Sequence, residues 1–204
     1  METPATKPIT IGILIFDDVE ELDFVGPWEV FGGLFKFSPE LGRAVLIAER
    51  AGQVQCNKGL RVLADYGFED APALDVILVP GGQGTRREVN NPRLIEWLRK
   101  TGAQCAWVTS VCTGTLLLHE AGFARGKRVT THWNFVKTLQ ERGDVTVLDG
   151  PRYVRDGNLV TAAGVSAGID MALWLVGQLW TPDVARRVQR YIQYDPAPPY
   201  SAEV

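Results

Sequence analysis

The sequence has few of the residues that build metal sites and disulfide frameworks. Its 204 residues include two histidines and three cysteines, and the cysteines, Cys56, Cys105 and Cys112, form no close pair. Zinc sites need closely spaced cysteine and histidine ligands, and secreted disulfide frameworks need an even set of cysteines. We therefore expect no metal and no disulfide, and a reducing compartment, the cytoplasm.

An excess of basic charge is also missing. Lys and Arg number 21 against 24 Asp and Glu, which gives a formal charge of -3 and no overall attraction for nucleic acid or an anionic membrane. The apolar run at residues 9–16 is too short to span a membrane and leads into acidic residues, unlike a signal peptide. The glycines at 81–84 match neither the dinucleotide fingerprint nor a phosphate loop. We expect no cofactor, no nucleic acid and no membrane as partners.

The sequence does contain a regular alternation of apolar strands and amphipathic helices. Strands are expected at residues 9–16, 43–49, 75–79, 104–110 and 158–163, and helices from Gly26-Pro27 to Gly32-Gly33, at 92–102, at 115–121, from about Ser166 and from Pro182. This order predicts a single α/β domain over residues 1–204, with a doubly wound, mostly parallel sheet and helices on both faces. Residues 1–8 are expected to be a flexible tail, and the Pro-rich residues 195–204 an extended one.

Cys112 lies where a predicted strand ends and a predicted helix begins. Its sulfur is therefore expected at the carboxyl edge of the sheet, where ligands of such folds bind and where helix N–H groups favour the thiolate. The layout follows the logic of a nucleophile elbow, in which a small residue such as Gly114 permits a sharp turn. Position alone leaves a buried, inert cysteine open as the alternative.

Several motifs together resemble the ThiJ/PfpI superfamily, over nearly the whole chain. They are Thr109-Ser-Val-Cys-Thr-Gly-Thr-Leu-Leu-Leu118, the segment 126–133 with His132, the segment 22–27 with Asp23, the turn Val79-Pro-Gly-Gly82, and the segment 163–170 with Val165. The resemblance implies a flavodoxin-like fold. Within the superfamily the chain is similar to the isocyanide hydratase branch, which shares Asp23, Cys112 and a Pro-rich segment like the one from Tyr194.

The resemblance also implies roles for individual residues. Cys112 would be the nucleophile, and Asp23 its general acid and base, since a carboxyl group beside a sulfur in a dry site can stay protonated. The N–H groups of Gly82 and Thr113 would form an oxyanion-hole-like pocket, and the Thr113 side chain would orient a water or substrate atom.

Other readings of these residues remain open. Val165 and His132 are secondary candidates, and His132 fits a hydrogen-bonding role at a helix end equally well. Asp23 could instead be the N-cap of the helix near Gly26, and Gly82 could simply form a turn.

The resemblance implies the hydration of a small-molecule isocyanide. Cys112 would attack the terminal carbon, an acid would protonate the product, and water would resolve the thioimidate to an N-formamide without a cofactor. Thr113 stands where the members regarded as proteases carry histidine, so a Cys-His protease is not expected.

Two other functions remain open. One is glyoxalase or deglycase chemistry, for which relatives usually have glutamate in place of Asp23. The other is a redox- or ligand-sensing module, as in the N-terminal half of some transcription regulators. Whichever function holds, the resemblance, the six tryptophans and the Pro-rich tail predict that the chain forms a homodimer.

Overall fold

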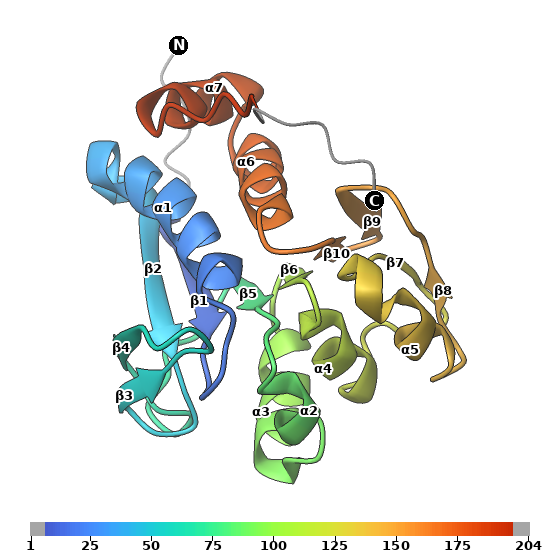
Figure 1. Cartoon of the computed structure of the whole chain (residues 1–204). Coiled ribbons are helices and arrows are strands. Elements are labelled where there is room, and N and C mark those ends of the chain that lie inside the picture. The colour runs from blue at the N-terminus through green and yellow to red at the C-terminus, as the bar shows by residue number, and fades with distance from the viewer. Residues whose placement is uncertain (1–6, 198–204) are drawn as a thin grey trace.

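The computed structural model describes residues 7–197, and Figure 1 shows the arrangement of their helices and strands. The two predicted tails, residues 1–8 and 195–204, lie mostly outside the described part of the chain.

A six-stranded sheet forms the centre of the molecule, in the strand order β2-β1-β5-β6-β10-β9. Its strands are β1 (Ile9–Leu14), β2 (Gly42–Ile47), β5 (Val76–Val79), β6 (Trp107–Val111), β9 (Tyr153–Asp156) and β10 (Leu159–Ala162). All neighbouring pairs are parallel except β10 and β9, which are antiparallel. Every residue of β5 and of β10 is buried, as expected for strands covered on both faces. The predicted mostly parallel sheet is confirmed.

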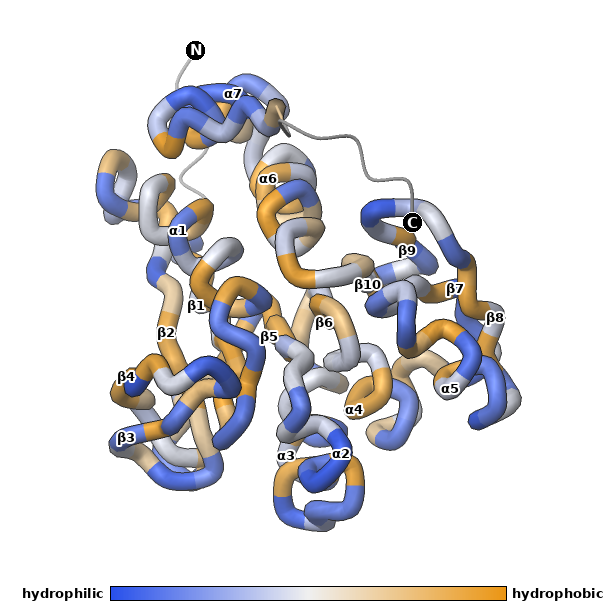
Figure 2. Tube along the Cα trace, viewed as in Figure 1, coloured by the Kyte–Doolittle hydropathy of each residue, from blue (hydrophilic) through white to orange (hydrophobic). Residues whose placement is uncertain are grey.

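Helices cover both faces of this sheet (Figure 1). One layer contains α1 (Glu21–Phe37), α6 (Ala167–Leu179) and α7 (Pro182–Tyr191), and the other contains α2 (Thr85–Glu88), α3 (Pro92–Gly102), α4 (Gly114–Glu120) and α5 (Val136–Gln140). Figure 2 shows hydrophobic residues along the strands and hydrophilic residues over the outer side of α7. The predicted helix starts at Asn91-Pro92 and Thr181-Pro182 are confirmed. Asn91 Oδ1 accepts hydrogen bonds from two N–H groups of α3, and Thr181 Oγ1 accepts one from α7.

Short elements outside the main sheet were not predicted. They are the antiparallel pair β3 (Gly52–Gln55) and β4 (Arg61–Ala64), the parallel pair β7 (Arg128–Val129) and β8 (Thr146–Val147), and the 3₁₀ turns η1 (Pro39–Leu41) and η2 (Trp133–Phe135). Their strands have two to four residues, which is too short for a hydrophobic period to stand out from the sequence. The edge strand β9 was also missed.

The prediction of a short helix from Gly26-Pro27 to Gly32-Gly33 is wrong in both bounds, because α1 is longer. The helix begins five residues before Gly26 and continues past the Gly32-Gly33 pair to Phe37. Its glycines allow close helix packing: a Cβ at Gly26 would lie 2.9 Å from Ile169 Cγ1 of α6, and one at Gly33 would lie 3.0 Å from Tyr191 Cδ1 of α7. Packing against two helices therefore overrides the low helix propensity of glycine and proline.

None of the helices in residues 7–197 is both long and apolar enough to cross a membrane.

Candidate active site

Cys112 lies on a strained turn between β6 and α4. Its φ of 56° is in the left-handed region that non-glycine residues seldom adopt, and its backbone N–H donates to the carbonyl oxygen of Ala163 at 2.6 Å. A Cβ at Gly114 would overlap the carbonyl oxygen of Val79. Gly114 is thus required for the close approach of the turn to β5, as the nucleophile-elbow reading expects.

Asp23 is fully buried in the first turn of α1. The N–H of Gly81 donates to its Oδ2 at 2.8 Å, whereas its Oδ1 has no hydrogen-bond partner among the described residues. Burial raises the pKa of Asp23 to about 7; the Glu20 charge adds to this rise, while the Gly81 N–H and the neighbouring Cys112 thiol oppose it. The N-cap of α1 is Glu20, so the alternative reading of Asp23 as a helix cap is wrong.

Gly81 makes room for this carboxyl group beside the elbow. A Cβ at Gly81 would lie 2.9 Å from Asp23 Oδ2 and 2.5 Å from the backbone nitrogen of Thr113. The turn after β5 therefore needs glycine here for a steric reason, because Asp23 and Thr113 both pack against its Cα.

The sulfur of Cys112 is held as a thiol. Burial raises its pKa to about 12, and the negative charge of Asp23 adds to the rise, against the N–H groups of Thr113 and Val165 and the Thr113 hydroxyl, which lower it. The expectation that helix position favours the thiolate is therefore wrong for the free protein. The helix that follows has only seven residues, and 6% exposure of Cys112 leaves almost no water to solvate a thiolate.

The backbone donors near the sulfur differ from the expected pair of Gly82 and Thr113, because Val165, a secondary candidate, takes the place of Gly82. The N–H of Gly82 donates to Thr113 Oγ1 at 3.1 Å rather than to the sulfur, and Gly82 has a φ of 118°. The second backbone donor at the sulfur is instead the N–H of Val165, whose φ is 42°. A positive φ is a marked outlier for a β-branched side chain, so no local sequence signal could have identified this donor.

His132 lies beside the sulfur but has a structural partner. It is the N-cap of η2, and its Nδ1 lies 2.6 Å from Asn134 Oδ1. A Cβ at Gly164 would lie 2.6 Å from His132 Cδ2, so the ring packs against the backbone just before Val165. The hydrogen-bonding role at a helix end is confirmed.

A cavity of about 190 Å³ opens onto these groups. It is lined by the predicted residues Gly82, Cys112, Thr113, His132 and Val165, and by Glu20, Asn57, Gln83, Arg86 and Asn134, which the sequence analysis missed. Asp23 does not line the cavity itself. It interacts with Cys112, which does. Four of the missed residues lie in loops or turns, and Arg86 lies in the short helix α2. Only tertiary structure brings such scattered positions together.

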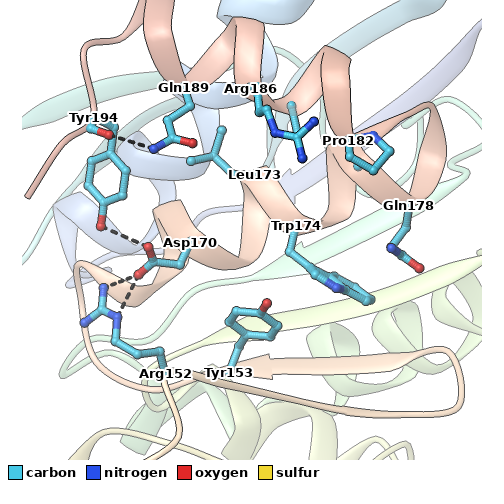
Figure 3. Close-up of a pocket in the computed structure, with 12 residues that line it drawn as sticks. Arg152, Tyr153, Asp170, Leu173, Trp174, Gln178, Pro182, Arg186, Gln189 and Tyr194 are labelled. Carbon is cyan, nitrogen blue, oxygen red and sulfur yellow. Dashed lines mark hydrogen bonds and ion pairs between the residues drawn. The ribbon is translucent and has the colours of Figure 1, made fainter.

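A larger cavity, of about 610 Å³, lies between α6, α7 and β9 (Figure 3). Tyr153 and Trp174 form one wall, and at one end Arg152 and Tyr194 both bond to Asp170. It contains no cysteine and none of the predicted site residues. Size commonly marks a binding site, but here the nucleophile and its carboxyl partner are at the smaller cavity, and we place the chemistry there.

The described residues hold neither a metal-ligand cluster nor a disulfide. No group of three His, Cys, Asp or Glu side chains within residues 7–197 could hold a metal ion. Cys56, Cys105 and Cys112 are all buried and unpaired.

Comparison with known proteins shows what this chain is similar to. The model of the DJ-1/PfpI family matches residues 9–178. The isonitrile hydratase of Pseudomonas putida is 41% identical over 194 residues, which cover 95% of this chain and 82% of that relative. The HTH-type transcriptional regulator CdhR of Pseudomonas aeruginosa is 29% identical over 86% of this chain, but the match spans only 52% of the regulator.

Solved structures agree with this result. A ThiJ/PfpI family protein from Pseudomonas syringae has a TM-score of 0.89 and 31% identity, over 98% of this chain and 81% of that one. Drosophila melanogaster DJ-1beta, with a TM-score of 0.79 over 93% of this chain and 100% of its own, is only 19% identical and shows the shared fold alone.

Proposed function

The chain belongs to the DJ-1/PfpI family, and we propose that it hydrates isonitriles to N-formamides with Cys112 as the nucleophile. The observation that carries the proposal is the position of the Cys112 thiol beside a buried Asp23 carboxyl group whose Oδ1 has no hydrogen-bond partner in the described chain. The identity of 41% with an isonitrile hydratase supports the same reaction.

The first half of the reaction needs a proton to leave sulfur and arrive at carbon. Asp23, with a pKa raised to about 7, is a suitable base for this transfer at neutral pH. As sulfur bonds to the terminal carbon of R–N≡C, Oδ1 accepts the thiol proton and then delivers it to that carbon. The product is a thioimidate, R–N=CH–S–Cys112, and the carboxylate is regenerated.

The second half adds water. A water molecule attacks the thioimidate carbon, and Asp23 takes one of its protons. The remaining hydroxyl proton moves to the nitrogen as the tetrahedral species expels the sulfur, which leaves R–NH–CHO. The N–H groups of Thr113 and Val165 stabilise the departing thiolate, which recovers its proton from Asp23. Substrate and one water are consumed, one formamide is released, and neither a metal nor a redox cofactor takes part.

An activity screen of the purified chain tests the proposal. An aryl isonitrile would give a formamide, methylglyoxal would give lactate, and a peptide would give a free amine. We expect formamide alone. Lactate without formamide would replace the proposal by glyoxalase chemistry, and the absence of all three products would favour a sensing role.

We also propose that the protein is a homodimer in the cytoplasm. Phe37 and Tyr191 are 61% and 42% exposed and contact each other edge to face, with ring centroids 4.6 Å apart. They border an apolar cavity of about 430 Å³ between α1 and α7, the kind of surface that subunit contacts cover. Sedimentation equilibrium at micromolar concentration should give twice the 22.5 kDa chain mass; a monomer would refute the dimer.

A further inference from the structure

Arg86 gives the cavity beside Cys112 a fixed positive charge. It is the single Lys or Arg side chain among the ten residues that line this cavity. The cavity's one carboxylate, Glu20, forms an ion pair with Lys58. Among residues 7–197 no ion pair includes Arg86, so no carboxylate of the described chain is paired with its charge.

The guanidinium of Arg86 is held in place by neutral groups. Its Nη1 donates to the carbonyl oxygen of Gly82 at 2.9 Å, to Thr85 Oγ1 at 3.1 Å and to Thr113 Oγ1 at 3.4 Å. Its Cζ lies 4.8 Å from the ring centroid of the buried Phe135. These contacts use one nitrogen and one face of the group, which leaves the other N–H donors free for a ligand in a preorganised fork.

The position of this charge relative to the nucleophile sets the length of a matching ligand. Thr113 follows Cys112 directly in the chain, and its Oγ1 lies 3.4 Å from Arg86 Nη1. One residue therefore separates the guanidinium from the reacting thiol. The cavity volume of about 190 Å³ also favours a compact substrate over a long or polycyclic one.

We propose that Arg86 selects isonitriles that carry a carboxylate close to the isonitrile nitrogen, the class of α-isocyano carboxylates. This inference rests on the proposed hydration of isonitriles and names the substrate class of that same site. The terminal carbon would lie against Cys112 while the carboxylate accepts charge-assisted hydrogen bonds from Arg86.

The test compares isocyanoacetate with its methyl ester, which has the same reacting group and no charge. We expect the wild type to show a kcat/KM about tenfold higher for the anion, since a charge-assisted hydrogen bond at a partly exposed group is worth about one such factor. In Arg86→Gln that preference should disappear. The ratio of anion to ester isolates recognition, because any disturbance of Thr113 by the substitution affects both substrates alike.

Arg87→Gln is the matched control. It removes the same charge from the adjacent residue, but Arg87 is paired with Asp18 and Glu88 and does not line the cavity. It should keep the wild-type ratio. High salt should lower the ratio in the wild type and leave Arg86→Gln unchanged.

The outcomes separate this inference from the function on which it rests. Hydration of the ester with no preference for the anion, or a preference that Arg86→Gln retains, would overturn the role of Arg86 and leave the hydratase intact. If neither compound were hydrated, the hydratase would fail, and binding of the product N-formylglycine against its methyl ester would still decide whether Arg86 holds a carboxylate. Equal binding of the two, or binding unaffected by Arg86→Gln, would then overturn the anion site.

Discussion

Asp23 in α1 lies beside the sulfur of Cys112 at the end of β6, and the two groups shift each other's pKa in opposite directions. The charge of Asp23 helps to raise the pKa of Cys112 to about 12, whereas the Cys112 thiol moderates the rise of the Asp23 pKa to about 7. Between these values the pair holds one proton. That proton is the one the proposed reaction moves from sulfur to carbon.

Replacing either member of this pair should stop or slow formamide production for different reasons. Cys112→Ala removes the covalent intermediate and should abolish turnover. Asp23→Asn keeps the shape and the acceptor for Gly81 but cannot move a proton, so it should lose about 10²–10⁴-fold in kcat/KM. The assay is formamide formation from an aryl isonitrile, with circular dichroism to establish folding. Near-wild-type rates in folded Cys112→Ala would contradict the mechanism.

The pH dependence should report the Asp23 carboxyl group. Its base form is the carboxylate, so kcat/KM should rise with pH up to about 7 and then level off, since the pKa of Cys112 lies near 12. Initial rates at pH 5–9, corrected for uncatalysed hydrolysis, measure this profile. Asp23→Asn should lack the rising limb; a variant that kept it would assign the limb to another group.

Asp23 should also reduce stability as the pH rises. Its folded pKa of about 7 lies above the ordinary value of 3.8, so its favourable contribution is complete below pH 4 and is lost as the pH rises to about 7. Relative to the wild type, Asp23→Asn should therefore gain unfolding free energy over this range, by about 4 kcal/mol at most. Urea denaturation at pH 4 and pH 8 measures the difference.

Asp156→Asn is a control for that measurement, because the pKa of Asp156 is shifted in the opposite direction to that of Asp23. The N–H of Arg128 and the charge of Lys127 lower the pKa of Asp156, so its contribution is present above its ordinary pKa and is lost as the pH falls. This variant should gain nothing at pH 8. A gain in both variants would show that the effect does not come from burial of Asp23.

Alkylation of the cysteines should be slow and should begin at Cys112. The pKa is raised at all three, to about 11 for Cys56 and about 12 for Cys105 and Cys112, so few thiolates exist at neutral pH. Cys112 lines an open cavity and has Asp23 to accept its proton, whereas Cys105 Sγ contacts the carbonyl oxygens of Leu74 and Thr101. Mass spectrometry after limiting iodoacetamide at pH 8 should find Cys112 labelled first, and more slowly in Asp23→Asn. Prior labelling of Cys105 would count against this.

Two glycine substitutions should have opposite effects on stability. A Cβ at Gly114 overlaps Val79 O, so Gly114→Ala should destabilise the protein by more than about 2 kcal/mol, as overpacking against backbone does, and impair activity. Gly32, inside α1, has nothing within 4 Å of its Cβ position. Gly32→Ala should therefore stabilise by about 0.5–1 kcal/mol and leave activity unchanged. Thermal unfolding of both variants compares them, and a neutral Gly114→Ala would argue against a tight elbow.

The sequence by itself determined the strand and helix alternation, the parallel sheet and the location of Cys112 at a strand-to-helix turn. These follow from local hydrophobic periods and caps such as Asn91, which short segments encode. The nucleophile-elbow layout also predicted a small residue at Gly114, and the family resemblance implied that Asp23 is the partner of Cys112.

Only the tertiary structure decided the protonation state and the lining of the site. The pKa of Cys112 depends on burial by residues from the whole fold, and the second N–H donor comes from Val165 in a backbone conformation that valine does not favour alone. Helix α1 continues through Pro27 and three glycines because α6 and α7 pack against it. Arg86 reaches the cavity because Gly82, Thr85 and Thr113 hold it there. Burial and long-range contacts sum over residues distant in the chain, so no local pattern contains them.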